Sequence, residues 1–325
     1  MKVHEDREAF KVLLETIQKR TGYRTDVLEK DYYVVLILEE LAKLQSNGLA
    51  AYFKGGTALY KALKTTNRFS EDIDLSVETR GCSRTQNDKI LERATKKYTS
   101  LKREASLGHT NRSEVTAVYL YDPVVSYDVN DTLQRFGKVK VEATSFTISE
   151  PVEPLEITPM IYELANVRER EILENNYNIN PFTIETITLA RIFIDKLFAA
   201  EAYVRQSDKP HRAFEAAKHI YDLVVMLKEA QIEKFISDKV RMSELLSIRL
   251  EEELQRLDGI PKILPVEFMF FDTVRNNVEV RTAYDLMQRQ YVLRDEDIIT
   301  FDVAMKTIHV LKLRLLENSS WTRGR

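Results

Sequence analysis

The chain has 325 residues, of which 44% are hydrophobic and 30% are charged, and its formal net charge is −3. This composition is typical of a globular protein of one or two domains and argues against a general, non-specific coat for DNA. Apolar runs such as Tyr32 to Leu38 are too short to cross a bilayer, and no apolar signal core follows the charged N-terminus. The single cysteine, Cys82, excludes an internal disulfide and a structural zinc site is not expected. We therefore expect a cytoplasmic protein with no membrane segment.

The first half of the chain mixes helical and strand patterns. Apolar residues at three- and four-residue spacing predict helices over 5–20, 26–44, 57–63 and 84–103. Alternating or short apolar runs predict strands over 49–53, 72–78, 115–121 and 138–146. The proline-interrupted stretch 153–161 is expected at the edge of a sheet.

The second half has helical spacing almost throughout. Helices are expected over 186–206, 211–229, 238–256, 280–292 and 297–317. We predict an α+β protein with a mixed β-sheet, whose first domain covers residues 1–165 and whose helical domain covers residues 166–325 and completes an active-site cleft.

Two aspartates, Asp72 and Asp74, lie on the strand expected over 72–78. Because residues two apart on a strand point to one face, their carboxylates are held side by side. Like charges this close repel unless a cation neutralises them, and paired oxygen ligands suit Mg²⁺. Two solvent-facing acids on an ordinary strand would give the same pattern, so the interpretation depends on the neighbouring motifs.

A strand-to-helix turn precedes the aspartates. Lys54, Gly55, Gly56 and Thr57 end the strand at 49–53 and open the next helix. Glycines let the backbone approach a ligand closely, and a helix N-terminus attracts phosphate. Any tight turn could use Gly-Gly-Thr, and the motif is not a P-loop. A phosphate cradle followed at short distance by a metal pair is, however, what nucleotidyl transfer needs.

A third acid is expected on a neighbouring strand, and Glu142 in the strand 138–146 is the candidate. Lys138, Lys140 and Glu142 share one face of that strand. Glu142 could complete the metal site or act as a general base. A surface ladder of lysine and glutamate across the sheet is the alternative.

Two apolar helices carry charges in their middles. Lys196 and Asp195 interrupt one apolar run and Asp222 interrupts another. Buried charges are costly unless they are paired or used. Lys196 could therefore contact a triphosphate with Asp222 in the same cleft, or it could form a structural pair with Asp222 or Asp195. The basic face of the helix expected over 84–103 could contact RNA, or it could be a solvated surface.

These motifs resemble the AbiEii/AbiGii toxin family of nucleotidyltransferases. The resemblance is carried by Phe53 to Leu59 and Arg68 to Leu75, and extends to Glu29 to Tyr32, Asp195 to Ala199 and Lys218 to Leu223. It implies a DNA-polymerase-β-like nucleotidyltransferase domain joined to a helical domain. It also implies an active-site serine at Ser70, with further site residues at Lys196 and Asp222. The interval between the glycines and Asp72 is about one residue longer than the family pattern, and Thr57 replaces a more usual serine.

The resemblance implies a toxin that transfers a nucleoside monophosphate from an NTP to an acceptor, with tRNA as that acceptor, in a toxin–antitoxin or phage-defence system. Its cofactor would be Mg²⁺, bound by Asp72, Asp74 and Glu142, and a cognate antitoxin would be its partner. Two alternatives stay open: a nucleotidyltransferase acting on a small molecule or a protein hydroxyl, and a catalytically inactive nucleotide-binding module.

Overall fold

The computed structural model describes residues 1–325 except 67, 112, 128–134, 255–262 and 318–325. Contacts between residues divide the chain into two compact units. The first unit contains residues 1–62 and 70–186, and the second contains residues 63–69 and 187–325. The short segment 63–69 thus leaves the first unit and packs with helices that lie far along the sequence.

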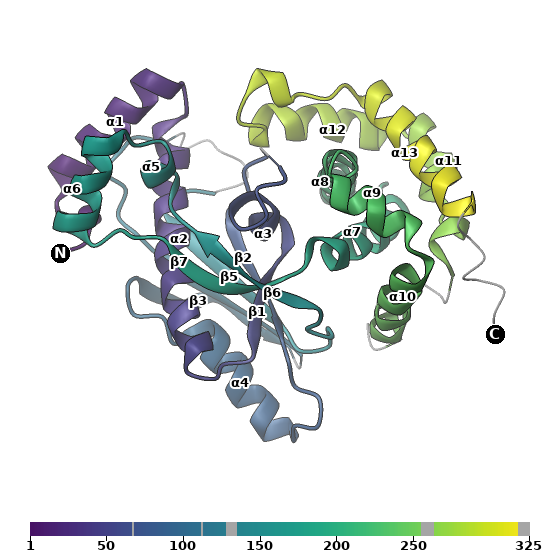
Figure 1. Cartoon of the computed structure of the whole chain (residues 1–325), viewed down its shortest axis with the longest axis horizontal. Coiled ribbons are helices and arrows are strands. Elements are labelled where there is room, and N and C mark those ends of the chain that lie inside the picture. Colours follow the sequence, from purple (N-terminus) through teal and green to yellow (C-terminus); the bar gives the residue numbers. More distant parts are fainter. Residues whose placement is uncertain (67, 112, 128–134, 255–262, 318–325) are drawn as a thin grey trace. The chain divides into compact units, whose positions relative to one another are not determined.

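The first unit is built on a seven-stranded mixed sheet in the order β3-β4-β5-β2-β1-β7-β6 (Figure 1). Its strands are β1 (Ala51–Lys54), β2 (Asp72–Val77), β3 (Lys102–Asn111), β4 (Glu114–Leu120), β5 (Lys138–Thr144), β6 (Val152–Ile157) and β7 (Phe182–Ile187). Strand β2 runs antiparallel to β1 and parallel to β5, so it lies in the interior of the sheet. The expected position of the proline-interrupted strand at an edge is confirmed, because β6 ends the strand order.

Helices of the first unit surround this sheet. They are α1 (Arg7–Thr21), α2 (Thr25–Ser46), α3 (Gly55–Lys61), α4 (Arg84–Lys96), α5 (Met160–Glu163) and α6 (Val167–Tyr177), after a short 3₁₀ turn, η1 (Val3–Glu5). Helix α4 packs on β2, β4 and β5, and α2 packs on β5. The apolar face of β2, with Ile73, Leu75 and Val77 fully buried, supplies the core and leaves Asp72 and Asp74 on the opposite face.

The charged residues near the start of α2 are used for packing within this unit. Glu29 accepts the backbone N–H of Val124 at 2.7 Å, and Asp31 accepts that of Met160 at 2.6 Å and pairs with the buried Lys61 at 3.0 Å. Lys30 donates to the carbonyl oxygen of Lys138 at the start of β5. These contacts explain why three consecutive charged residues are buried on one helix.

The second unit is helical. It contains α7 (Leu189–Val204), α8 (Pro210–Met226), α9 (Ala230–Ser237), α10 (Lys239–Glu253), α11 (Phe270–Thr273), α12 (Val278–Tyr291) and α13 (Phe301–Glu317), with 3₁₀ turns η2 (Pro265–Glu267), η3 (Val274–Asn276) and η4 (Asp295–Asp297). Helix α8 packs against α7, α12 and α13, and it is the centre of this unit. No described helix is both long enough and apolar enough to span a membrane.

The prediction of an α+β fold with a mixed sheet and C-terminal helices is confirmed, but two strands were missed. The helix expected over 84–103 ends at Lys96, and Lys102 and Arg103 begin strand β3, so the predicted basic face is shorter than expected. Strand β3 is exposed along nearly its whole length and therefore lacks the alternation that marks a half-buried strand. Strand β7 pairs with β1, and it joins residues beyond 165 to the sheet.

Candidate functional site

Sheet register brings three carboxylates together on one face of the first unit. Asp74 lies opposite Glu142 on β5, and Asp72 lies opposite Lys140. On the other side of β2, Asp74 lies opposite Lys54, the last residue of β1. Directly opposed residues on neighbouring strands have Cβ atoms about 5 Å apart. The predicted grouping of Asp72, Asp74 and Glu142 is therefore present in the sheet.

Gly55 makes room for the Asp74 carboxylate. Its φ is +79°, in the left-handed region that favours glycine, and a Cβ added to it would lie 2.1 Å from Asp74 Oδ2. Strand β1 and helix α3 meet at this residue. The glycine thus serves both the turn geometry and the close approach of backbone to the acid. The sequence predicted the turn, whereas the close approach of the Gly55 backbone to Asp74 is seen only in the structure.

Thr57 and Ser70 connect the turn to strand β2. Thr57 is fully buried, its hydroxyl donates to the carbonyl oxygen of Asp72, and its Oγ1 lies 2.9 Å from Ser70 Oγ. Ser70 precedes Asp72 by two residues, and it is only half-buried. The Thr57 hydroxyl therefore ties helix α3 to the start of β2, while Ser70 keeps access to solvent.

Lys140 lies among the carboxylates. Its Nζ is 2.8 Å from Asp72 Oδ2 and 3.3 Å from Glu142 Oε2. Burial lowers the pKa of Lys140, but the charges of Asp72 and Glu142 outweigh that effect, so its pKa lies above the usual value. Burial, and then the charges of Glu142 and Asp72, raise the pKa of the Asp74 carboxyl to about 7. The charges of Lys54 and Lys140 oppose this rise in the pKa of Asp74 but do not outweigh it.

The chemistry of these donors fits Mg²⁺. Carboxylate oxygens are the ligands that this hard cation prefers, and a divalent ion would stabilise the ionised form of Asp74. Asp72 and Asp74 project from a strand that is fixed in the sheet on both sides, so their separation is set by the backbone. Within the described residues, no group of three His, Cys, Asp or Glu side chains is arranged to hold a metal ion, so the fit rests on the chemistry of the donors and on the Asp72–Asp74 pair.

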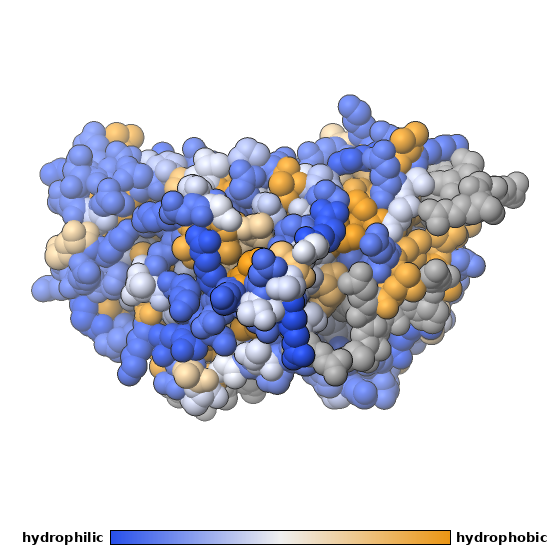
Figure 2. All heavy atoms as spheres, turned by 90° about the horizontal axis from the view of Figure 1, so that it is seen from below, coloured by the Kyte–Doolittle hydropathy of each residue, from blue (hydrophilic) through white to orange (hydrophobic). Residues whose placement is uncertain are grey.

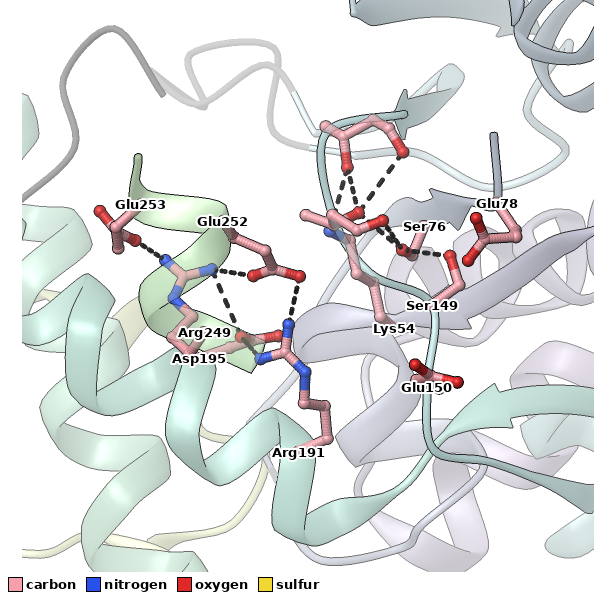
Figure 3. A network of polar contacts seen from close by, with 12 residues as sticks. Lys54, Ser76, Glu78, Ser149, Glu150, Arg191, Asp195, Arg249, Glu252 and Glu253 are labelled. Atoms are coloured by element: carbon pink, nitrogen blue, oxygen red, sulfur yellow. Dashed lines mark hydrogen bonds and ion pairs between the residues drawn. The ribbon is translucent and has the colours of Figure 1, made fainter. Parts of the chain in front are cut away.

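A chain of hydroxyl groups continues from this face of the sheet (Figure 3). Lys54 Nζ donates to Thr144 Oγ1 at 3.1 Å, and Thr144 Oγ1 lies 3.2 Å from Thr147 Oγ1. Ser76 Oγ is 2.6 Å from Thr147 Oγ1 and 2.7 Å from Ser149 Oγ. These contacts hold the ammonium group of Lys54 at the end of β1, beside the turn at Gly55.

In the second unit, Lys196 and Asp222 form a buried ion pair. Lys196 Nζ is 2.8 Å from Asp222 Oδ2, and the guanidinium of Arg68 binds both carboxylate oxygens of Asp222 at 2.9 and 3.0 Å. Asp222 is fully buried. Burial opposes its ionisation, but Arg68 and Lys196 outweigh burial and hold the pKa of Asp222 well below its usual range. Two cations around one anion leave this cluster with a net positive charge.

Asp195 takes a different partner from Lys196. It accepts from Arg191 at 2.6 Å, and Arg249 lies 3.4 Å away. Both arginines also contact Glu252, which is fully buried (Figure 3). This network ties α7 to α10. Of the two structural pairs that the sequence left open for Lys196, the structure shows the one with Asp222.

Two residues of these clusters were not singled out from the sequence. Arg68 was noted only as part of a motif, although an arginine four residues before Asp72 is a signal that could have been followed. Lys140 was recognised as sharing a face with Glu142, but its contact with Asp72 depends on the parallel pairing of β2 and β5. That pairing is not local in sequence.

Comparison with known proteins identifies the family. Residues 36–307 match the model for the nucleotidyl transferase AbiEii toxin of type IV toxin–antitoxin systems. No curated protein matches the chain. Among solved structures, MenT4, a nucleotidyltransferase toxin from Mycobacterium tuberculosis, is 13% identical with a TM-score of 0.47, covering 96% of this chain and 92% of that one. JHP933 from Helicobacter pylori is 13% identical with a TM-score of 0.44, covering 93% and 97%. The family match spans most of the chain, which therefore belongs to the AbiEii nucleotidyltransferase toxins of type IV toxin–antitoxin systems.

Proposed function

We propose that this protein transfers a nucleoside monophosphate from an NTP to tRNA, with Mg²⁺ held by Asp72 and Asp74. The observation that supports the proposal is the register of β1, β2 and β5, which gathers Asp72, Asp74 and Glu142 beside the turn at Gly55. Membership of a nucleotidyltransferase family supplies the reaction class. When bound, Mg²⁺ supplies Lewis-acid stabilisation of charge on the phosphates.

The residues of the first unit would divide the work. Lys54 is a fixed cation beside the turn, and it would contact the triphosphate together with the backbone of Gly55 and Gly56. Thr57 holds the turn against β2, and Ser70 offers a half-buried hydroxyl that would donate a hydrogen bond to a phosphate oxygen or a metal-bound water. These proposed roles follow from the positions of the side chains, and each can be tested by a single substitution.

Glu142 has two candidate roles. It would complete the metal site with Asp72 and Asp74, or it would take the proton from the acceptor hydroxyl as a general base. Its Oε1 accepts a hydrogen bond from Thr116 Oγ1 at 3.3 Å, and its Oε2 lies near Lys140. Both oxygens thus contact neighbours on the sheet, and either role would require them to exchange a contact for the metal or the acceptor.

The buried cluster of the second unit suits an anionic ligand. Arg68, Lys196 and Asp222 together carry one excess positive charge. We propose that Lys196 stabilises negative charge on a bound anion and that Asp222 orients Lys196 through their 2.8 Å ion pair. The Arg68 contact keeps Asp222 ionised, so Asp222 would act through its charge and not as an acid.

Two partners follow from this proposal. The acceptor would be tRNA, whose phosphates would meet basic side chains of the protein. The second partner would be an antitoxin, as expected for a toxin of a type IV system. The presence of both aspartates and of Glu142 favours an active enzyme over an inactive nucleotide-binding module.

The test is incubation of the purified protein with total bacterial tRNA, Mg²⁺ and each NTP in turn, labelled at the α-phosphate. Label that appears on tRNA, and is absent with the Asp72→Ala/Asp74→Ala double variant, would support the proposal and identify the donor. Parallel reactions with a cell-free protein extract and with small-molecule fractions would test the alternative acceptors. Label found only on those acceptors would refute the choice of tRNA.

A further inference from the structure

The ammonium group of Lys140 bridges two of the three site carboxylates. It lies 2.8 Å from Asp72 and 3.3 Å from Glu142, while Asp74 is the next acid on β2. The side chains of Asp72, Lys140 and Glu142 are each between 34% and 39% exposed, so a ligand can reach them at the surface of the sheet. Lys140 therefore occupies a central position in the cluster.

The balance of charge in this cluster is informative. Asp72, Asp74 and Glu142 are three acids, and Lys140 is one cation in contact with two of them. Counting only the groups in direct ion-pair contact and Asp74, three carboxylates and one ammonium leave two negative charges, the charge that one divalent cation neutralises; the ammonium groups of Lys54 and Lys30 act on Asp74 and Asp72 without a direct ion pair. Lys54 is the lysine opposite Asp74, and its charge favours the ionised form of Asp74, while its Nζ donates to Thr144 Oγ1.

The geometry of Glu142 leads to the same conclusion. Its two oxygens are engaged by Thr116 and Lys140, and the three acids do not converge as a ready-made group of metal ligands in the described part of the chain. Asp72 and Asp74, by contrast, are paired by the two-residue repeat of one strand. The Asp72–Asp74 pair is thus the natural place for an ion, with Lys140 in contact with Asp72 and Glu142.

We propose that Lys140 is a built-in second cation of this site, so that in the absence of nucleotide the protein holds a single divalent metal ion at Asp72 and Asp74. Lys140 would neutralise Glu142 and the Oδ2 atom of Asp72, which would otherwise attract a second ion. This inference rests on the proposed metal site, and it specifies how many ions the protein itself holds.

The expected effect of removing the Lys140 charge is large enough to measure. A unit charge about 6 Å from a divalent ion in a water-like dielectric changes its affinity by about tenfold. Lys140→Met keeps the length of the side chain and removes the charge, so metal binding should become about tenfold tighter, and a second ion should be able to bind. Lys140→Arg keeps the charge and should restore the affinity of the wild-type protein.

The experiment is a titration of the full-length protein with Mn²⁺ alone at low salt, in which electron paramagnetic resonance reports the free ion. Lys138→Met is the matched control, because Lys138 lies two residues earlier on the same face of β5. The Asp72→Asn/Asp74→Asn variant gives the background, and far-UV circular dichroism confirms that each variant is folded. We expect one bound ion in the wild type and in Lys138→Met, and tighter binding or a second ion in Lys140→Met.

Different failures have different meanings. Equal or weaker binding by Lys140→Met, or two ions bound by the wild-type protein, would overturn the role of Lys140 and leave the metal site standing. Binding by the wild-type protein that does not exceed the double-variant background would overturn the metal site itself, and with it this inference.

Discussion

Asp222→Asn tests the buried charge cluster of the second unit. The substitution leaves Arg68 and Lys196 facing each other without the anion that both contact at 2.8 to 3.0 Å. Removing one partner of a buried ion pair costs about 3–5 kcal/mol. We expect the free energy of unfolding to fall by that amount at pH 7, measured by urea denaturation with far-UV circular dichroism. Asp302→Asn, which breaks an exposed pair with Arg281, should cost less than about 1 kcal/mol.

Lys196→Met provides an internal comparison. It removes one cation but leaves the Arg68–Asp222 pair intact, so we expect a smaller loss of about 1–2 kcal/mol. The effect of Asp222 should also depend on pH. Its folded-state pKa is depressed, so its contribution is present above the ordinary value of 3.8 and is lost as pH falls below that value toward the folded pKa.

Two results would refute this account of the cluster. A loss below about 1 kcal/mol for Asp222→Asn would mean that the carboxylate is not the buried counter-ion of both cations. A loss for Lys196→Met as large as that for Asp222→Asn would mean that Arg68 does not hold Asp222 by itself.

Two further substitutions test the first unit. Gly55→Ala should lower both the free energy of unfolding and the affinity for Mn²⁺, because its Cβ would lie 2.1 Å from Asp74 Oδ2. Gly48→Ala is the control: Gly48 has a similar positive φ with nothing within 4 Å, so this variant should show only the backbone strain of about 1 kcal/mol. Equal effects of the two variants in unfolding and Mn²⁺ titrations would argue against the contact with Asp74. Burial raises the pKa of Glu29 to about 7, so the wild-type protein should lose stability as pH rises from 4.5 through 7. Glu29→Gln, which keeps an acceptor for Val124, should avoid this loss of about 2–3 kcal/mol, and parallel urea curves of the two proteins across that range would contradict the assignment.

The parts of the fold that the sequence predicted are those with local signals. Strands β2 and β5 each alternate apolar and polar residues, so both strands and their polar faces could be predicted directly from the sequence. The turn at Gly55 and Gly56 could be read in the same way. These elements carry Asp72, Asp74 and Glu142, so the grouping of the three acids on one face of the sheet could be predicted from the sequence.

Contacts between distant residues could not be predicted. Arg68 meets Asp222 across 154 positions of sequence, and nothing near either residue indicates the other. Strand β7 was hidden because its last residues overlap the apolar pattern of the helix that follows, and because its partner β1 lies far away in the chain. Strand β3 has one neighbour, β4, and is otherwise exposed, so its sequence is polar without a period.

We propose that Asp72 and Asp74 bind a metal ion that nucleotidyl transfer requires. The most direct test is the rate of label transfer from an α-labelled NTP as Mg²⁺ is varied, for the wild-type protein and for Asp74→Asn, with unfolding curves to show that the variant is folded. We predict that transfer by the wild type saturates with Mg²⁺ and stops when the ion is chelated, and that Asp74→Asn does not rise above background. Transfer that persists in chelator, or a variant as active as the wild type, would contradict the claim.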